Sequence, residues 1–236
     1  MTLALAVIAP PTGSADAATS LPVPVNLAAG LVGDSRQLII VSSSGWKAST
    51  ASVSLYELKP AGWKRVAGPF YARVGRNGMK IDHVEGDGTT PAGSFPAVSA
   101  FGLRANPGSK LPWTKLKSGD CWISDSAHPD YNTMVVQKPC GAQNEDLWSI
   151  ARRGPYAKAI VSGYNMNPVV AGKGSAIFLH LHSRTASGAT KPTSGCVSLS
   201  DWQLSVLLRR LDPATKPRIV MGPAHWLTAS ESAIVR

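Results

Sequence analysis

The segment Ala176-Ile-Phe-Leu-His-Leu-His182 alternates in side-chain type, and Pro192-Thr-Ser-Gly-Cys-Val-Ser198 follows it after a loop of small and polar residues. Successive side chains of a β-strand point to opposite faces, so the alternation predicts a strand with two chemically different faces. One face carries Ile177, Leu179 and Leu181, and the other carries Phe178, His180 and His182. The two segments therefore predict a sheet that presents histidine beside a glycine–cysteine turn.

Cys196 and the strand histidines have the chemistry of a nucleophile and its base. A cysteine nucleophile needs a base for its proton and backbone N–H groups aimed at the developing oxyanion. Ser194-Gly195-Cys196 suits the second need, because glycine lets the backbone form a turn that directs consecutive N–H groups to one point. A nearby imidazolium is also expected to lower the pKa of the thiol.

Short strand-like runs punctuated by turns make up most of the remaining chain, in keeping with 22 Gly and 18 Pro residues. The clearest runs are 37–41, 51–58, 63–66, 159–162 and 218–221. Ser200 is the expected N-cap of the one clear helix, and Pro213 follows its end. Its apolar face comprises Leu204, Leu207, Leu208 and Leu211. The predicted fold class is mostly β, with one or two short helices.

The 236 residues are expected to form one large domain. Residues 1–17 resemble the second half of a secretory signal peptide, ending in Ala15-Asp16-Ala17, although no basic residue precedes the apolar run. We expect export to the cell wall, on the periplasmic or extracellular face, with no transmembrane segment. Residues 18–34 are predicted to be a flexible lead-in, 35–225 the domain and 226–236 a tail. We expect a monomer.

Three cysteines fit an oxidising compartment. Cys121 and Cys140 are close enough in sequence to close one loop, within an irregular excursion over 102–148. The arrangement expected is a Cys121–Cys140 disulfide with Cys196 free for chemistry. Three buried thiols are the alternative.

Positive charge favours an anionic partner, because 24 Lys and Arg residues face 14 Asp and Glu residues, a net charge of +10. The basic residues are scattered, with no run longer than Lys64-Arg65, Arg152-Arg153 or Arg209-Arg210. No nucleic-acid motif accompanies them, so anionic cell-wall polymers are favoured over nucleic acid.

His180, a spacer and Thr193-Ser194-Gly195-Cys196-Val197 together resemble the signature of the YkuD-type L,D-transpeptidases. The upstream run Gly86-Asp-Gly-Thr-Thr-Pro-Ala-Gly-Ser-Phe95 is similar to a second recurrent segment of that family. The likeness extends over about residues 37–221, including the regions around Asp125, Tyr131-Asn132 and 173–180. It implies a single L,D-transpeptidase-like domain, a β-sandwich or barrel, that acts on peptidoglycan stem peptides without a cofactor.

The resemblance implies a mechanism. Cys196 attacks the carbonyl of the third stem-peptide residue and expels the terminal D-Ala, His180 is the base, and Thr193, Ser194 and Gly195 form the oxyanion motif with Cys196. A side-chain amine of a second stem then attacks the thioester, giving a cross-link. His182 is an auxiliary candidate, because its spacing to Cys196 is shorter than the family pattern.

Other functions remain open. Water as acceptor would make the same site an L,D-carboxypeptidase, and a low-activity wall-binding or adhesive protein could keep the fold. The sequence departs from the common pattern at Ser194, where many members have His or Lys, at Ser198, where Arg or Asn is frequent, and at Leu181, where Gly or Ser is usual.

Two further site types can be drawn from the residues. A His-x-His pair with Cys196 could bind a metal, but no fourth ligand is evident, so no metal is expected. Glu85 and Asp87 could be read as the carboxylate pair of a glycosidase, but their glycine-rich setting favours a turn. His83 lies in a similar polar stretch and is expected to face solvent.

Overall fold

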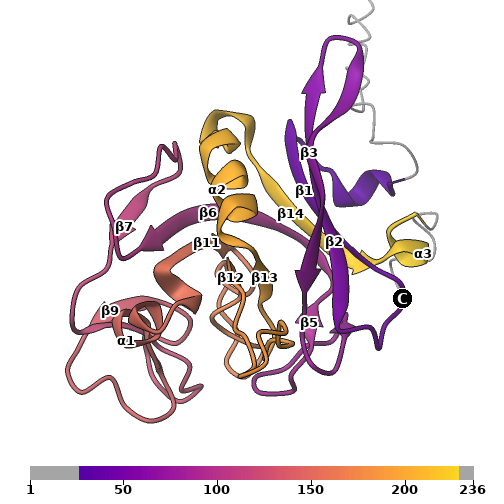
Figure 1. The fold of residues 1–236 in the computed structure, drawn as a ribbon. Coiled ribbons are helices and arrows are strands. Elements are labelled where there is room, and N and C mark those ends of the chain that lie inside the picture. The colour runs from indigo at the N-terminus through magenta and orange to yellow at the C-terminus, as the bar shows by residue number, and fades with distance from the viewer. Residues whose placement is uncertain (1–26, 229–236) are drawn as a thin grey trace, which may run out of the picture.

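The computed structural model describes residues 27–228, and its main feature is a nine-stranded mixed sheet in the order β11-β12-β13-β3-β2-β1-β14-β6-β7 (Figure 1). These strands are β1 Gln37–Ser43, β2 Thr50–Lys59, β3 Gly62–Arg73, β6 Gly93–Gly102, β7 Trp113–Lys115, β11 Lys158–Ser162, β12 Phe178–Leu181, β13 Val197–Leu199 and β14 Arg218–Pro223. Strand β6 pairs with β14 and also with β11, so the sheet closes on itself. The mostly β prediction is confirmed.

Smaller elements complete the described chain. Two short parallel strands, β4 Met79–Lys80 and β5 Thr90–Pro91, form their own pair, and β8 Asp120–Trp122, β9 Met134–Val136 and β10 Glu145–Asp146 form a three-stranded sheet. The α-helices are α1 Leu147–Arg152, α2 Asp201–Arg210 and α3 Ala224–Leu227, one more than expected. Three 3₁₀ turns are η1 Ala29–Leu31, η2 Pro155–Ala157 and η3 Pro213–Thr215.

Helix α2 forms where the sequence predicts it. Ser200 is its N-cap, and the Gln203 side chain accepts a hydrogen bond from the Ser200 backbone N–H at 3.0 Å. The predicted apolar face is fully buried against the sheet, in a cluster that includes Leu179 and Val197. Burying one leucine contributes about 1.5–3 kcal/mol, so this face anchors the helix next to the strands that carry His180 and Cys196.

The two faces of β12 separate as the alternation predicts. Ile177 and Leu179 belong to the largest buried cluster, with Leu181 packed against its edge. Phe178 belongs to a second cluster, where its ring meets those of Phe101, Trp122 and Tyr156 edge-on. The strand itself is shorter than predicted, because regular pairing ends at Leu181.

The predicted lead-in and tail meet in one buried cluster. Leu27, Leu31 and Val32 pack with Trp226 and Leu227, so residues 27–34 are part of the folded body. The predicted domain boundary at 225 also falls inside α3. The rest of both segments, including the predicted signal peptide, lies outside the described residues.

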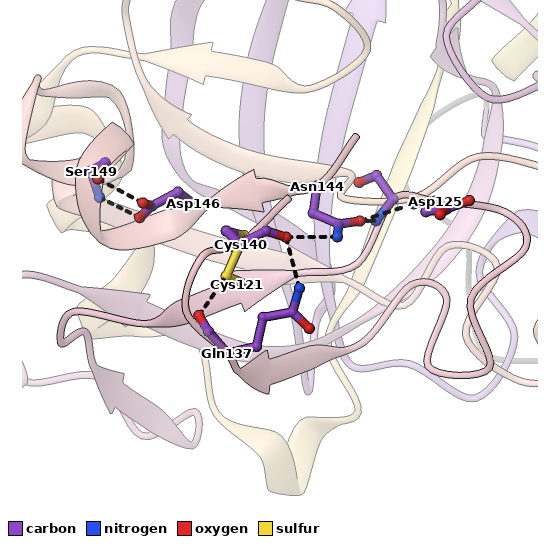
Figure 2. Close-up of a disulfide and its surroundings, with 8 residues drawn as sticks. Cys121, Asp125, Gln137, Cys140, Asn144, Asp146 and Ser149 are labelled. Atoms are coloured by element: carbon purple, nitrogen blue, oxygen red, sulfur yellow. Dashed lines mark hydrogen bonds between the residues drawn. A yellow bond between two sulfur atoms is a disulfide. The ribbon is translucent and has the colours of Figure 1, made fainter. Parts of the chain in front are cut away.

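The irregular excursion folds around the disulfide. Cys121 of β8 is bonded to Cys140, as predicted, with 5.7 Å between the Cα atoms (Figure 2). Gln137 and Asn144 both donate side-chain hydrogen bonds of 2.8 Å to the Cys140 carbonyl. Cys121 also lies opposite Asp146 of β10, so the disulfide holds the strand that carries Glu145.

No helix of the described residues is both long and apolar enough to cross a membrane.

Candidate active site

A cavity of about 310 Å³ is lined by both Cys196 and His180. Its other walls include two regions far from Cys196 in sequence. The segment before β5 contributes His83 and Glu85, and the disulfide-bonded excursion contributes Glu145, followed by Tyr156. Figure 1 shows the excursion, with β9 and α1, beside β11 and β12.

Cys196 is a buried thiol, 8% exposed, at the floor of this cavity. Its Sγ–H donates to the Ala176 carbonyl at 3.1 Å, and the Phe178 N–H donates to the sulfur at 3.4 Å. Burial and the nearby Glu145 charge raise the thiol pKa to about 12, while Phe178 N–H and the Tyr156 hydroxyl act in the opposite direction. The expectation of a lowered thiol pKa is therefore wrong, because burial outweighs the hydrogen bonds.

His180 is held in one tautomer by the backbone. Its Nδ1 lies 2.7 Å from the Leu181 carbonyl, which can only accept, so Nδ1 carries the proton and Nε2 is the basic nitrogen. Tyr156 packs edge-on against the imidazole, with 5.1 Å between ring centroids. Burial lowers the pKa of His180 to about 4, so the ring is neutral at ordinary pH. No hydrogen bond joins Nε2 to the Cys196 sulfur, whose proton goes to Ala176.

His182 lies outside the cavity. Its Nδ1 is 2.9 Å from Ser198 Oγ, and its ring packs 6.0 Å from that of Tyr71. Burial, followed by the charges of Arg184 and Arg73, lowers its pKa to about 4. Although alternation puts both histidines on one face, the strand ends between them, and only His180 shares the cavity with Cys196.

Thr193 and Thr90 fix the turn that carries Cys196. Thr193 Oγ1 donates to the Cys196 carbonyl at 2.5 Å and accepts from the Gly195 N–H at 3.2 Å. Thr90 Oγ1 donates to the Gly195 carbonyl at 2.7 Å. The second sequence segment of the resemblance thus supports the cysteine turn directly. The Gly195 N–H is engaged with Thr193, so it is not available as an oxyanion donor in this conformation.

Gly195 is favoured by the close approach of its neighbours rather than by an unusual backbone angle. A Cβ at this position would lie 3.1 Å from the Thr89 carbonyl and 3.3 Å from Ile177. Ser194, by contrast, is exposed, and its hydroxyl accepts a hydrogen bond of 3.2 Å from Arg76.

Glu145 and Tyr156 form a polar pair in the cavity wall that sequence reasoning missed. The Tyr156 hydroxyl donates to Glu145 Oε2 at 2.5 Å. Burial raises the pKa of Glu145 to about 7, although part of the side chain is accessible, and the charge of Glu85 acts in the same direction. Neither residue has a spacing to His180 or Cys196 that a motif could reveal, because the excursion is placed by non-local pairing.

His83 is buried, 3% exposed, so the expectation that it faces solvent is wrong. Its Nδ1 lies 2.9 Å from both Thr89 Oγ1 and Asp87 Oδ1, and its ring packs edge-on against Tyr164. Asp87 also accepts from the Thr89 backbone N–H and hydroxyl. The glycine-rich stretch is thus a turn, as predicted, and Asp87 stabilises it; His83 closes one side of the cavity.

Within residues 27–228, no three His, Cys, Asp or Glu side chains are grouped so that they could hold a metal ion.

Comparison with known proteins identifies the family of the chain and finds similar solved structures. The family model of the YkuD L,D-transpeptidase catalytic domain matches residues 47–220. The helical cell shape determining protein Pgp2 from Campylobacter jejuni is similar at 14% identity and a TM-score of 0.40, over 81% of this chain and 49% of that one. A mutant of Pgp2 matches with the same identity and TM-score, over 52% of its length. The chain thus spans about half the length of these structures, and no curated protein matches it.

Proposed function

The chain belongs to the YkuD family of L,D-transpeptidase catalytic domains, and from this premise we propose that it is an exported cysteine L,D-transpeptidase that cross-links peptidoglycan. Cys196 is the nucleophile and His180 the base. The third residue of a stem peptide is the acyl donor. The observation that carries the proposal is the shared cavity, where a free thiol lies with a histidine whose basic nitrogen is fixed by the Leu181 carbonyl.

The first half-reaction forms a thioester. As the Cys196 sulfur attacks the donor carbonyl, the thiol proton moves to Nε2 of His180. The tetrahedral intermediate then expels the terminal D-Ala by breaking the C–N bond, and the proton on His180 passes to the leaving amine. Because thiol and imidazole are both neutral at rest, the proton moves only when substrate is bound and the sulfur turns from the Ala176 carbonyl.

The second half-reaction releases the enzyme. A neutral amine of a second stem attacks the thioester carbonyl, forms a new amide and returns the proton to the sulfur through His180. Water in place of the amine gives the L,D-carboxypeptidase alternative. The backbone N–H of Cys196 is our candidate for the main oxyanion donor, since that of Gly195 is engaged with Thr193.

The test is covalent acylation of the protein. Incubation with a carbapenem or a tetrapeptide stem should add one acyl group, seen by intact mass spectrometry, and Cys196→Ala should abolish it. His180→Ala should slow acylation by at least about 10²-fold, the usual scale for loss of a general base. His182→Gln is the matched control and should react at close to the normal rate, because His182 lies outside the cavity.

A wall-binding protein without turnover would give a different result. It would stay unacylated while still binding wall fragments. Reaction of the Cys196→Ala protein, or a dead His182→Gln variant beside a normal His180→Ala variant, would overturn the assigned roles.

A further inference from the structure

Beyond the thiol and the imidazole, the cavity contains an unused buried hydroxyl. Ser175 lines the cavity and is 7% exposed, and its Oγ has no hydrogen-bond partner within the described chain. Leaving a buried hydroxyl unpaired is unfavourable, so a ligand that hydrogen-bonds to this group would be stabilised. Its chain neighbour Ala176 holds the thiol proton of Cys196, which puts Ser175 next to the reacting atoms.

Two carboxylates line the same cavity without a basic partner. Glu85 Oε2 accepts from the Tyr131 hydroxyl at 2.6 Å, and Glu145 Oε2 accepts from Tyr156. No lysine or arginine in the described residues lies within 4.0 Å of either carboxylate, in a chain whose net charge is +10. Tyr131 also accepts from the backbone N–H of Gly174, directly before Ser175.

Glu85, Glu145 and Ser175 therefore all lie around the same cavity. Tyr131 links Glu85 to the segment that carries Ser175, and Tyr156 links Glu145 to His180 and Cys196. Glu85 is close enough to Glu145 for its charge to help raise the pKa of the Glu145 carboxyl. A cation bound between them would relieve this repulsion and satisfy the free oxygen lone pairs.

We propose that Glu85, Glu145 and Ser175 form a subsite for a primary ammonium group, the side-chain amine of the donor stem's third residue. This assignment rests on the proposed function and adds the recognition step to it. The bound ammonium stabilises the ionised form of Glu145, so that both carboxylates are charged in the complex and keep the amine protonated. An ammonium has no lone pair. The donor amine therefore cannot attack its own thioester, and only a neutral amine from a second stem can react.

Binding to the Cys196→Ala protein tests the subsite without any turnover. The probes are a tetrapeptide stem with a free amine on its third residue and the same peptide with that amine acetylated, compared by calorimetry. The free-amine peptide should bind at least about tenfold more tightly, corresponding to about 1.4 kcal/mol. Glu85→Gln and Glu145→Gln, added separately, should each reduce this ratio severalfold, and together bring it close to one. Ser175→Ala should reduce it less.

Glu57→Gln is the matched control, because Glu57 pairs with Lys59 on β2 and does not line the cavity. Its ratio should equal that of the parent. A ratio near one in the parent, or a ratio that survives the double Glu85→Gln, Glu145→Gln change, would overturn the subsite. Acylation of Cys196 in the otherwise unchanged protein is scored separately. If Cys196 is acylated but the free-amine peptide binds no more tightly than the acetylated one, only the subsite is refuted. If the free-amine peptide binds more tightly but Cys196 is not acylated, only the proposed enzymatic activity is refuted.

Discussion

At the residue scale, burial determines the charge of the histidines. His180 has a pKa lowered from 6.5 to about 4, chiefly by burial, and the pKa values of His83 and His182 are lowered as well. Glu145 is shifted the other way, from 4.5 to about 7. These groups stay neutral in the folded protein, at pH values where they would be charged in the unfolded chain.

His180 and Glu145 should therefore make the free energy of unfolding change with pH in opposite directions. Between pH 6.5 and 4 the unfolded chain binds a proton that folded His180 does not, so stability contributed by this residue is lost as the pH falls. At about 1.4 kcal/mol per pKa unit, the shift from 6.5 to about 4 corresponds to roughly 3 kcal/mol. Glu145 behaves conversely, since its contribution is present below pH 4.5 and is lost as the pH rises through 7.

Chemical denaturation of three proteins between pH 4 and 8 checks both signs. His180→Gln should lose less stability in acid than the parent protein, by up to about 3 kcal/mol. Glu145→Gln should lose more. The comparison uses the slope with pH within each variant, so a constant cost of the substitution cancels. A His180→Gln profile parallel to that of the parent would contradict the neutral buried imidazole.

At the scale of elements, the disulfide both stabilises the fold and positions a strand of the cavity wall. Cys121 and Cys140 are 19 residues apart, and the bridge lies opposite β10, which carries Glu145 and leads into α1. Asp146 caps α1 by accepting from both the N–H and the hydroxyl of Ser149 at 2.8 Å (Figure 2). The excursion has only short strands of its own. The disulfide is expected to stabilise the fold mainly by reducing the conformational freedom of this segment in the unfolded chain.

Replacing both Cys121 and Cys140 by Ser should lower the free energy of unfolding by about 3 kcal/mol, the chain-entropy value for a loop of this length. The measurement is urea denaturation under oxidising conditions, in a Cys196→Ala background that prevents exchange. Reductant should lower the stability of the parent by a similar amount and leave the double variant unchanged. Equal stability of the two proteins without reductant would show that the bridge contributes nothing.

Elements with a local signal could be predicted from sequence, and those placed by distant contacts could not. Strand β12 and helix α2 follow from alternation and from leucines on one helical face, and both appear where expected. The cavity wall depends on β10, only two residues long, and on η2, a single 3₁₀ turn. Neither β10 nor η2 is long enough to show a periodic pattern, so the sequence does not predict that Glu145 and Tyr156 line the cavity. The burial of His83 could not be predicted, because a polar, turn-rich sequence does not show which side chain the turn buries.

At the scale of the whole molecule, closure of the sheet brings the chemistry together. Strand β12 pairs with β11 on one side and, in parallel, with β13 on the other, so His180 lies next to the strand that follows Cys196. Strand β11 in turn pairs with β6, which starts directly after the Thr90 segment. One closed sheet thus positions the nucleophile, its base and the threonine that fixes the turn.

The surface of the molecule carries its excess charge in dispersed form. The basic pairs Lys64-Arg65, Arg152-Arg153 and Arg209-Arg210 are all exposed. They lie on three different elements, in β3, at the end of α1 and at the end of α2, and Figure 1 shows α1 and α2 in different parts of the molecule. A charge distribution of this kind favours adhesion to an extended anionic polymer over binding at one point.

Retention on a column of immobilised polyphosphate should therefore fall with salt and depend on all three pairs. Each pair replaced by Gln should lower the salt concentration of half elution by a similar step, because surface charges on separate elements act almost independently. The triple replacement should show about the sum of the steps. A neutral dextran column is the control and should retain none of the proteins. If one pair alone abolished retention, the anion would bind at a local site, and the dispersed charge would not be the cause of adhesion.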